Sequence, residues 1–244
     1  MELLKIKKQK KQIMLLYVMF LVLIVSVFVF FVIFQRESFY AQLIFILVLF
    51  PVFGLSLFFK PKIEYLNNRY YLLLLLEEDI KPLKYKQNVF KEGWAQGILT
   101  KGKYLRHIDN NDYVLLYKVI KDPYKPKKKR YQTLEVILIH KHKNVNFYLD
   151  EVNQNISKLQ EEHLKQFTYK SVVLLQFMEV DDFNTEVSNK VKDATYLKQK
   201  NTYYLTLNIA INTKSKQALY VDGENKMFIN YFSYGLKLIE TYIN

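Results

Sequence analysis

A long uncharged apolar run near the N-terminus places the strongest constraint on the fold of this chain. Residues 13–34 contain no charged side chain and consist mainly of Leu, Val, Ile and Phe. As a helix rising about 1.5 Å per residue, the run would be about 33 Å long, enough to cross a hydrocarbon core of about 30 Å. A second uncharged run, residues 43–59, lies at the short end of the spanning range and contains Pro51 and Gly54, which membrane helices tolerate. We therefore predict an N-terminal transmembrane hairpin of two helices within residues 1–60.

The charges that flank these runs predict their orientation. The sequence KIKKQKKQ precedes the first run, and Lys60 and Lys62 follow the second, whereas the connection between them holds only Arg36, balanced by Glu37. Lys and Arg near the ends of membrane helices collect on the cytoplasmic side. We therefore expect a multi-pass protein of the cell (plasma) membrane with both termini in the cytoplasm.

Two other interpretations of the apolar runs remain open. The first run resembles a signal peptide in its position, but it exceeds the usual apolar region of about 7–15 residues and no A-x-A-like cleavage site follows it. The second run is short and contains Pro51, so a buried core helix is the alternative to a membrane span.

Residues 61–244 have a globular composition and patterns of both helix and strand. The chain holds 20 Tyr and 18 Phe but only 6 Gly and no Cys, which excludes disulfides, thiolate metal sites and thiol catalysis. Periodicity predicts helices over residues 63–79 (after a break at Pro61), 88–102, 150–167, 182–191 and 227–243, and strands over residues 104–108, 113–120, 133–140, 171–180, 203–211 and 217–223. Tight turns imply antiparallel pairs, and the strand–helix–strand stretch 133–180 implies one parallel crossover. The prediction is a cytoplasmic α+β domain with a mixed, mainly antiparallel sheet of about six strands.

Several local details refine this prediction. Asn88 and Asp182 stand where helix N-caps are expected, and Gly102 stands where a C-cap is expected. The segment 146–149 has a strand-like pattern and is expected to pair with residues 133–140.

A basic loop between two predicted strands is the main candidate for a functional surface. It includes Lys125, Lys127, Lys128, Lys129 and Arg130, flanked by Tyr124 and Tyr131. Anionic lipid attracts such clusters by about 1 kcal/mol per basic residue near the surface. Tyrosines beside basic residues also suit stacking on nucleic-acid bases, and a solvated loop without a ligand is the simplest alternative.

No catalytic or metal-binding motif is recognisable in the chain. The helix and strand order over residues 88–180 is similar to that of the PD-(D/E)xK nucleases, which need a carboxylate on the second strand and Glu-x-Lys on the third. Asp112 and Glu135 are the candidate carboxylates, but Ile137 stands where the lysine is required. His140 and His142 have a spacing that zinc sites use, but lysines adjoin them. We therefore predict no catalytic residue, no metal and no cofactor.

The sequence thus predicts a membrane-tethered cytoplasmic interaction domain rather than an enzyme. Its expected partners are the lipid bilayer, anionic lipid headgroups, a second copy of the chain, or another membrane protein, with nucleic acid less favoured. The alternative is a membrane-attached nucleic-acid-binding or nuclease-like module.

Overall fold

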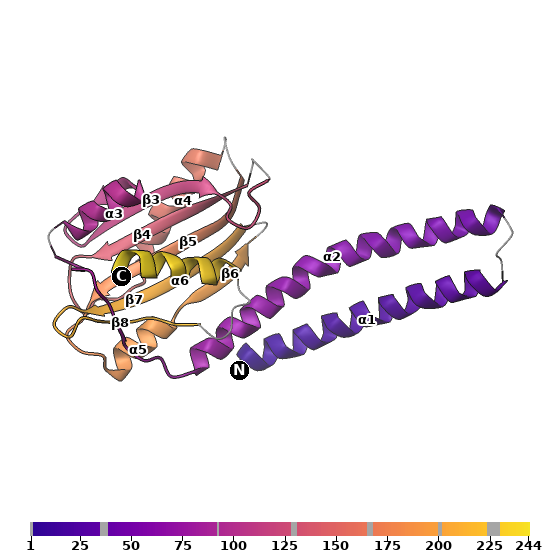
Figure 1. Ribbon diagram of the computed structural model, residues 1–244, viewed down its shortest axis with the longest axis horizontal. Helices are drawn as coiled ribbons and strands as arrows, with labels where there is room; N and C mark the ends of the chain where they lie inside the picture. The colour runs from indigo at the N-terminus through magenta and orange to yellow at the C-terminus, as the bar shows by residue number, and fades with distance from the viewer. Residues whose placement is uncertain are drawn as a thin grey trace. The chain divides into compact units, whose positions relative to one another are not determined.

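The computed structural model describes residues 2–34, 39–91, 93–127, 131–164, 168–199, 202–223 and 230–244 (Figure 1). The chain separates into two compact units, Met1–Leu73 and Leu74–Asn244.

The first unit consists of helix α1 (Glu2–Phe34) and most of helix α2 (Phe39–Glu77). In the described part of the chain, α1 is the one helix that is long and apolar enough to cross a membrane, with a mean hydropathy of 3.1 over its apolar window. The second predicted span, residues 43–59, lies within α2, and among the described residues no second candidate span is found there.

Helix α2 continues through Pro61, so the expected break and separate helix from residue 63 are wrong. Contacts with α1 lie on both sides of Pro61. The ring of Phe59 lies 6.5 Å from that of Tyr17, and Arg69 forms an ion pair with Glu2. These contacts favour one uninterrupted helix over the local cost of a proline, which removes one backbone hydrogen bond.

The second unit is an α+β domain built on an eight-stranded mixed sheet. Its strand order is β1-β8-β7-β5-β4-β3-β2. Strand β6 pairs with the first half of β7, and β8 pairs with the last residues of β7. The strands are β1 (Leu83–Lys84), β2 (Leu105–Asp109), β3 (Tyr113–Lys121), β4 (Tyr131–His140), β5 (Thr168–Glu179), β6 (Thr195–Gln199), β7 (Thr202–Asn212) and β8 (Gln217–Leu219). The β4–β5 and β5–β7 pairs are parallel and the others are antiparallel, so the expected mixed sheet with a parallel crossover is confirmed.

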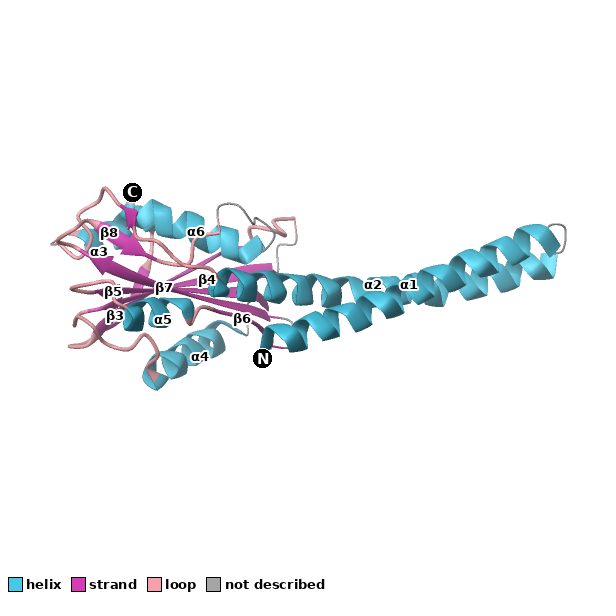
Figure 2. Ribbon diagram, turned by 90° about the horizontal axis from the view of Figure 1, so that it is seen from below, coloured by secondary structure: helices cyan, strands magenta, loops and turns pink. Residues whose placement is uncertain are grey.

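Helices cover both faces of this sheet (Figure 2). Helices α3 (Trp94–Gly102) and α6 (Asn230–Ile243) lie on one face, and α4 (Asp150–Leu164) and α5 (Thr185–Lys192) on the other. Alternate residues of β4 face these two helix layers, because successive side chains of a strand point to opposite faces of the sheet. Leu134, Val136 and Leu138 pack beneath α4 in the main core cluster, whereas Glu135 faces α6.

The sheet has eight strands rather than about six because two edge strands escape the sequence pattern. Strand β1 is only two residues long, and β6 alternates buried Tyr196 with exposed Leu197, so neither forms an apolar run. Conversely, the segment 146–149 is not a strand: Asn144 adopts a left-handed conformation with φ of 56°, and Phe147 turns inward, where its ring packs 6.0 Å from that of His140.

Three predicted helix ends also shift. Helix α3 begins at Trp94 rather than after Asn88, because Gly93 takes a left-handed conformation with φ of 85° as its N-cap. Gly102 is not the C-cap. A Cβ there would lie 2.8 Å from the Tyr104 ring, so this glycine allows close packing while Lys103 makes the left-handed turn.

The N-cap of α5 is likewise displaced from the predicted position. It is Asn184 rather than Asp182, and the Asn184 side chain accepts a hydrogen bond from the Val187 amide at 2.9 Å. An N-cap accepts from the second or third helical residue, and from position 184 that residue is Val187.

Candidate functional site

The basic loop after β3 is held in place by one buried acid, Asp122, whose side chain is fully buried. Its Oδ1 accepts a hydrogen bond from the Tyr124 amide at 2.9 Å, and its Oδ2 accepts one from the Tyr231 hydroxyl of α6 at 2.7 Å. The Asp122 amide in turn donates to the Tyr131 carbonyl at 3.1 Å, closing the loop. The only acid of the loop therefore points inward, while Lys125 and Lys127 are exposed.

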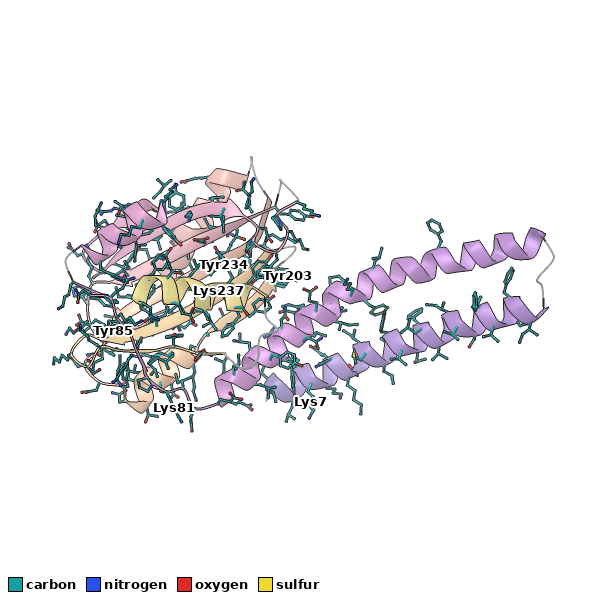
Figure 3. All side chains as sticks on the ribbon, viewed as in Figure 1. Lys7, Lys81, Tyr85, Tyr203, Tyr234 and Lys237 are labelled. Atoms are coloured by element: carbon teal, nitrogen blue, oxygen red, sulfur yellow. The ribbon has the colours of Figure 1, made fainter. Side chains whose placement is uncertain are left out.

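The sheet brings two further lysines to the same end of the domain. Strands β4, β5 and β7 are parallel and all begin there, next to the ends of β3 and β6. Lys170 of β5 lies with its Nζ 5.1 Å from the centroid of the Tyr131 ring. Lys198 of β6 lies with its Nζ 5.2 Å from the ring of its β7 partner Tyr203. Figure 3 labels Tyr203.

We call this surface the basic–aromatic edge and define it by seven described residues, Tyr124, Lys125, Lys127, Tyr131, Lys170, Lys198 and Tyr203. Within the described ranges, Lys125, Lys127 and Lys198 have no carboxylate at ion-pair distance. The remaining predicted residues of the loop, Lys128, Lys129 and Arg130, lie outside the described residues.

Tyrosine rings form a continuous row that includes two residues of the edge, Tyr124 and Tyr203. The Tyr124 ring meets that of Tyr231 edge-on at 5.3 Å, Tyr231 lies 5.6 Å from Tyr203, and Tyr203 stacks on Tyr196 at 5.8 Å. Burial and then the hydrogen bond to Asp122 raise the pKa of Tyr231 well above its usual value, so its hydroxyl remains a donor. The row supports an exposed Tyr124, which keeps 39% of its surface accessible.

Sequence reasoning found the loop but missed Asp122, Lys170, Lys198 and Tyr203. Their positions in the sequence could have indicated a shared surface, because Lys170 and Tyr203 stand at the beginnings of two apolar strands. The parallel order of β4, β5 and β7 places those beginnings together, and that order is a tertiary property.

The two candidate nuclease carboxylates are not brought together. Tyr113, which follows Asp112, pairs with His140, whereas Glu135 pairs with Lys118 five positions along the ladder. Asp112 is one position further away, so at about 3.3 Å per residue the two acids are separated by roughly 20 Å along the strand.

Glu135 belongs to a buried tyrosine network instead. It is 1% exposed and accepts hydrogen bonds from the hydroxyls of Tyr104 and Tyr234, while Tyr104 accepts one from Tyr242 at 3.2 Å. Figure 3 labels Tyr234 of α6. Burial and then the nearby Glu135 raise the pKa of both Tyr104 and Tyr234 far above the usual range. Both carboxylate oxygens of Glu135 are thereby engaged by protonated donors.

The two histidines considered for zinc differ in environment. His140 is 2% exposed, and its Nε2 has no hydrogen-bond partner among the residues that the structure describes. Burial lowers the pKa of His140 to about 4. His142 is exposed, with its Nε2 3.5 Å from a carboxylate oxygen of Asp112. Among the residues that the structure describes, no three His, Asp or Glu side chains gather as a metal site would require.

The chain was compared with known protein families, curated proteins and solved structures. No protein-family model, curated protein or solved structure matches the chain.

Proposed function

We propose that this chain is a membrane-tethered interaction protein whose α+β domain docks on the anionic cytoplasmic leaflet through the basic–aromatic edge. The observation that carries the proposal is the gathering of Lys125, Lys127, Lys170 and Lys198 at one end of the sheet, with the loop's own acid turned inward. Such a surface is complementary to a sheet of phosphate headgroups.

The expected strength of this contact suits a tethered domain. Each basic residue near an anionic surface contributes about 1 kcal/mol, so four lysines give only weak binding by themselves. A covalent anchor in the same membrane raises the effective concentration and makes weak binding sufficient. Tyr124 and Tyr131 add amphipathic rings of the kind that settle at the headgroup level.

The proposed anchor is a two-helix hairpin with both termini in the cytoplasm. Its first span is α1, and its second is the apolar run 43–59 of α2. The pairing of Tyr17 and Phe20 with Phe59, and of Glu2 with Arg69, supports antiparallel neighbours whose basic ends coincide. Lys10 extends this contact by lying 4.8 Å from the Tyr70 ring. A shared basic end is the arrangement that the positive-inside rule places in the cytoplasm.

Limited trypsin digestion of the reconstituted full-length protein tests the docking. In proteoliposomes containing phosphatidylglycerol, cleavage within residues 121–131 should be slower than in phosphatidylcholine alone, and high salt should abolish the protection because it screens the attraction. The exposed turn at Lys214 and Lys216 provides an internal control, because it lies at the opposite end of β7. Equal cleavage of the loop in both lipids would contradict the proposal.

The alternative function, nucleic-acid binding, is favoured by one feature of the same surface. Tyr124 is exposed beside Lys125 and Lys127, an arrangement suited to stacking on a single-stranded base. A gel shift with single-stranded RNA and DNA separates the two functions. Binding that is strong without lipid, together with unprotected trypsin sites on anionic vesicles, would favour the nucleic-acid module.

A further inference from the structure

A cleft of about 880 Å³ opens on the α3 and α6 face of the sheet, away from the residues of the basic–aromatic edge. Helix α3 and the C-terminal half of α6 form its walls, and Lys118 of β3 contributes to its lining. The volume falls within the range of about 300–1,000 Å³ that is typical of small-molecule sites.

Three lysines give this cleft its charge. Lys101 lies in the last turn of α3, Lys103 is its C-cap, and Lys118 holds its Nζ 5.4 Å from the Tyr104 ring. Across the described residues, none of the three forms an ion pair, and no carboxylate is among the residues that line the cleft. Glu135 is the cross-strand partner of Lys118, but it does not line the cleft, and its two oxygens accept hydrogen bonds from the hydroxyls of Tyr104 and Tyr234.

One part of the cleft wall is apolar and fixed in place, while Gln87, Asn88 and Thr241 add polar groups elsewhere in the lining. Trp94 donates from its Nε1 to the Tyr242 carbonyl at 2.9 Å, and its ring packs edge-on against Phe177 at 5.4 Å. Ile98 and Leu238 continue this wall. Gly97 borders the open space of the cleft, because a Cβ at this position would meet no atom within 4 Å among the described residues.

We infer that this cleft binds a small molecule that carries a phosphate group next to an aromatic or other apolar part. The lysines supply compact charges of the kind that bind phosphate, and the Trp94 wall supplies an apolar surface. A soluble phosphate ester and the headgroup of a phosphate-bearing lipid present the same chemistry. The inference concerns residues other than those of the proposed docking surface and stands without it.

The chain carries its own reporter for this site, since Trp94 is its only tryptophan. The full-length protein in detergent micelles is titrated with phenyl phosphate, and with phenol as the matched probe that lacks the phosphate. Tryptophan fluorescence should change saturably with phenyl phosphate and not with phenol. A soluble short-chain phosphatidic acid forms the second arm: tighter binding than phenyl phosphate assigns the site to a lipid headgroup, and weaker binding to a soluble ester.

Variants localise the binding. The pair Lys101→Gln and Lys118→Gln should weaken phenyl phosphate at least about tenfold, because a hydrogen bond to a charged group contributes enough for such a change. Gly97→Leu projects a side chain into this open space and should weaken binding. The pair Lys125→Gln and Lys127→Gln, at the basic–aromatic edge, should leave it unchanged.

Three results would overturn the inference: no response to phenyl phosphate, undiminished affinity in the Lys101 and Lys118 variant, or an equal loss in the edge variant. Circular dichroism of each variant verifies the fold, and the lysine variant decides the matter if Gly97→Leu does not fold. Loss of leaflet docking in the trypsin experiment leaves this result untouched, so the two proposals fail independently.

Discussion

At the scale of single residues, the stability of the domain depends on how the buried acid Glu135 is hydrogen-bonded. A carboxylate that is 1% exposed depends on the hydroxyls of Tyr104 and Tyr234, because an unpaired buried charge is costly. Tyr234→Phe removes one donor and should lower the free energy of unfolding by about 1.5–3 kcal/mol. Urea unfolding of the full-length protein in micelles measures the change.

Tyr204→Phe is the matched control for this prediction. Its hydroxyl lies 3.3 Å from the Gln160 amide in a half-buried, uncharged pair, so its loss should cost only about 0.5–1.5 kcal/mol. Equal losses in the two variants would show that the charge of Glu135 does not set the cost.

The buried His140 should make the free energy of unfolding depend on pH, because burial lowers its pKa. Its pKa is lowered to about 4 in the folded state, whereas the unfolded chain has the ordinary value near 6.5. The unfolded state therefore binds a proton first, and stability should fall as the pH drops from about 6.5 towards 4, by at most roughly 3 kcal/mol. The stabilisation is fully present above about pH 6.5.

The measurement compares the free energies of unfolding at pH 7 and pH 5. In His140→Leu this difference should be smaller than in the unchanged protein. A pH dependence that persists in His140→Leu would assign the effect to other groups.

At the scale of elements, the N-cap of α5 is a prediction with a simple control. Asn184→Ala removes the acceptor of the Val187 amide and should cost about 1 kcal/mol of unfolding free energy, whereas Asn184→Asp keeps an acceptor and should cost little. Urea unfolding of both variants tests this. Equal stability of the two variants would show that the hydrogen bond from the Val187 amide to the Asn184 side chain does not stabilise α5.

Elements with strong patterns were predictable from the sequence, and those defined by neighbours were not. The apolar runs of β4, β5 and β7 and the periodicity of α4 are local properties, so their positions followed from the residues. Strand β6 is half exposed and exists because it pairs with β7, which local sequence does not reveal. Helix α2 passes through Pro61 because α1 packs along it.

The candidate site divides in the same way. Charge and composition indicated the basic loop, since five of its basic residues lie within one short segment. The inward orientation of Asp122 depends on Tyr231, which is 109 positions away in the sequence. The position of Lys198 beside Tyr203 depends on the order of the strands in the sheet. Both are consequences of tertiary packing that no local pattern encodes.

At the scale of the whole molecule, the proposed topology has a direct chemical test because the chain contains no cysteine. Ser38→Cys places a thiol in the connection between the proposed spans, and Ser215→Cys places one in the exposed turn between β7 and β8. A membrane-impermeant maleimide applied to intact cells should label position 38, because the connection faces outward if both termini are cytoplasmic. Position 215 should react only after permeabilisation.

The same pair of variants separates the competing topologies. Labelling of position 215 in intact cells would place the α+β domain outside and remove the cytoplasmic leaflet as its docking surface. Labelling of both positions only after permeabilisation would place the connection on the same side as the α+β domain and would mean that α1 alone serves as the span. The hairpin requires the remaining outcome, because two antiparallel spans with coinciding basic ends must expose their connection on the side opposite those ends.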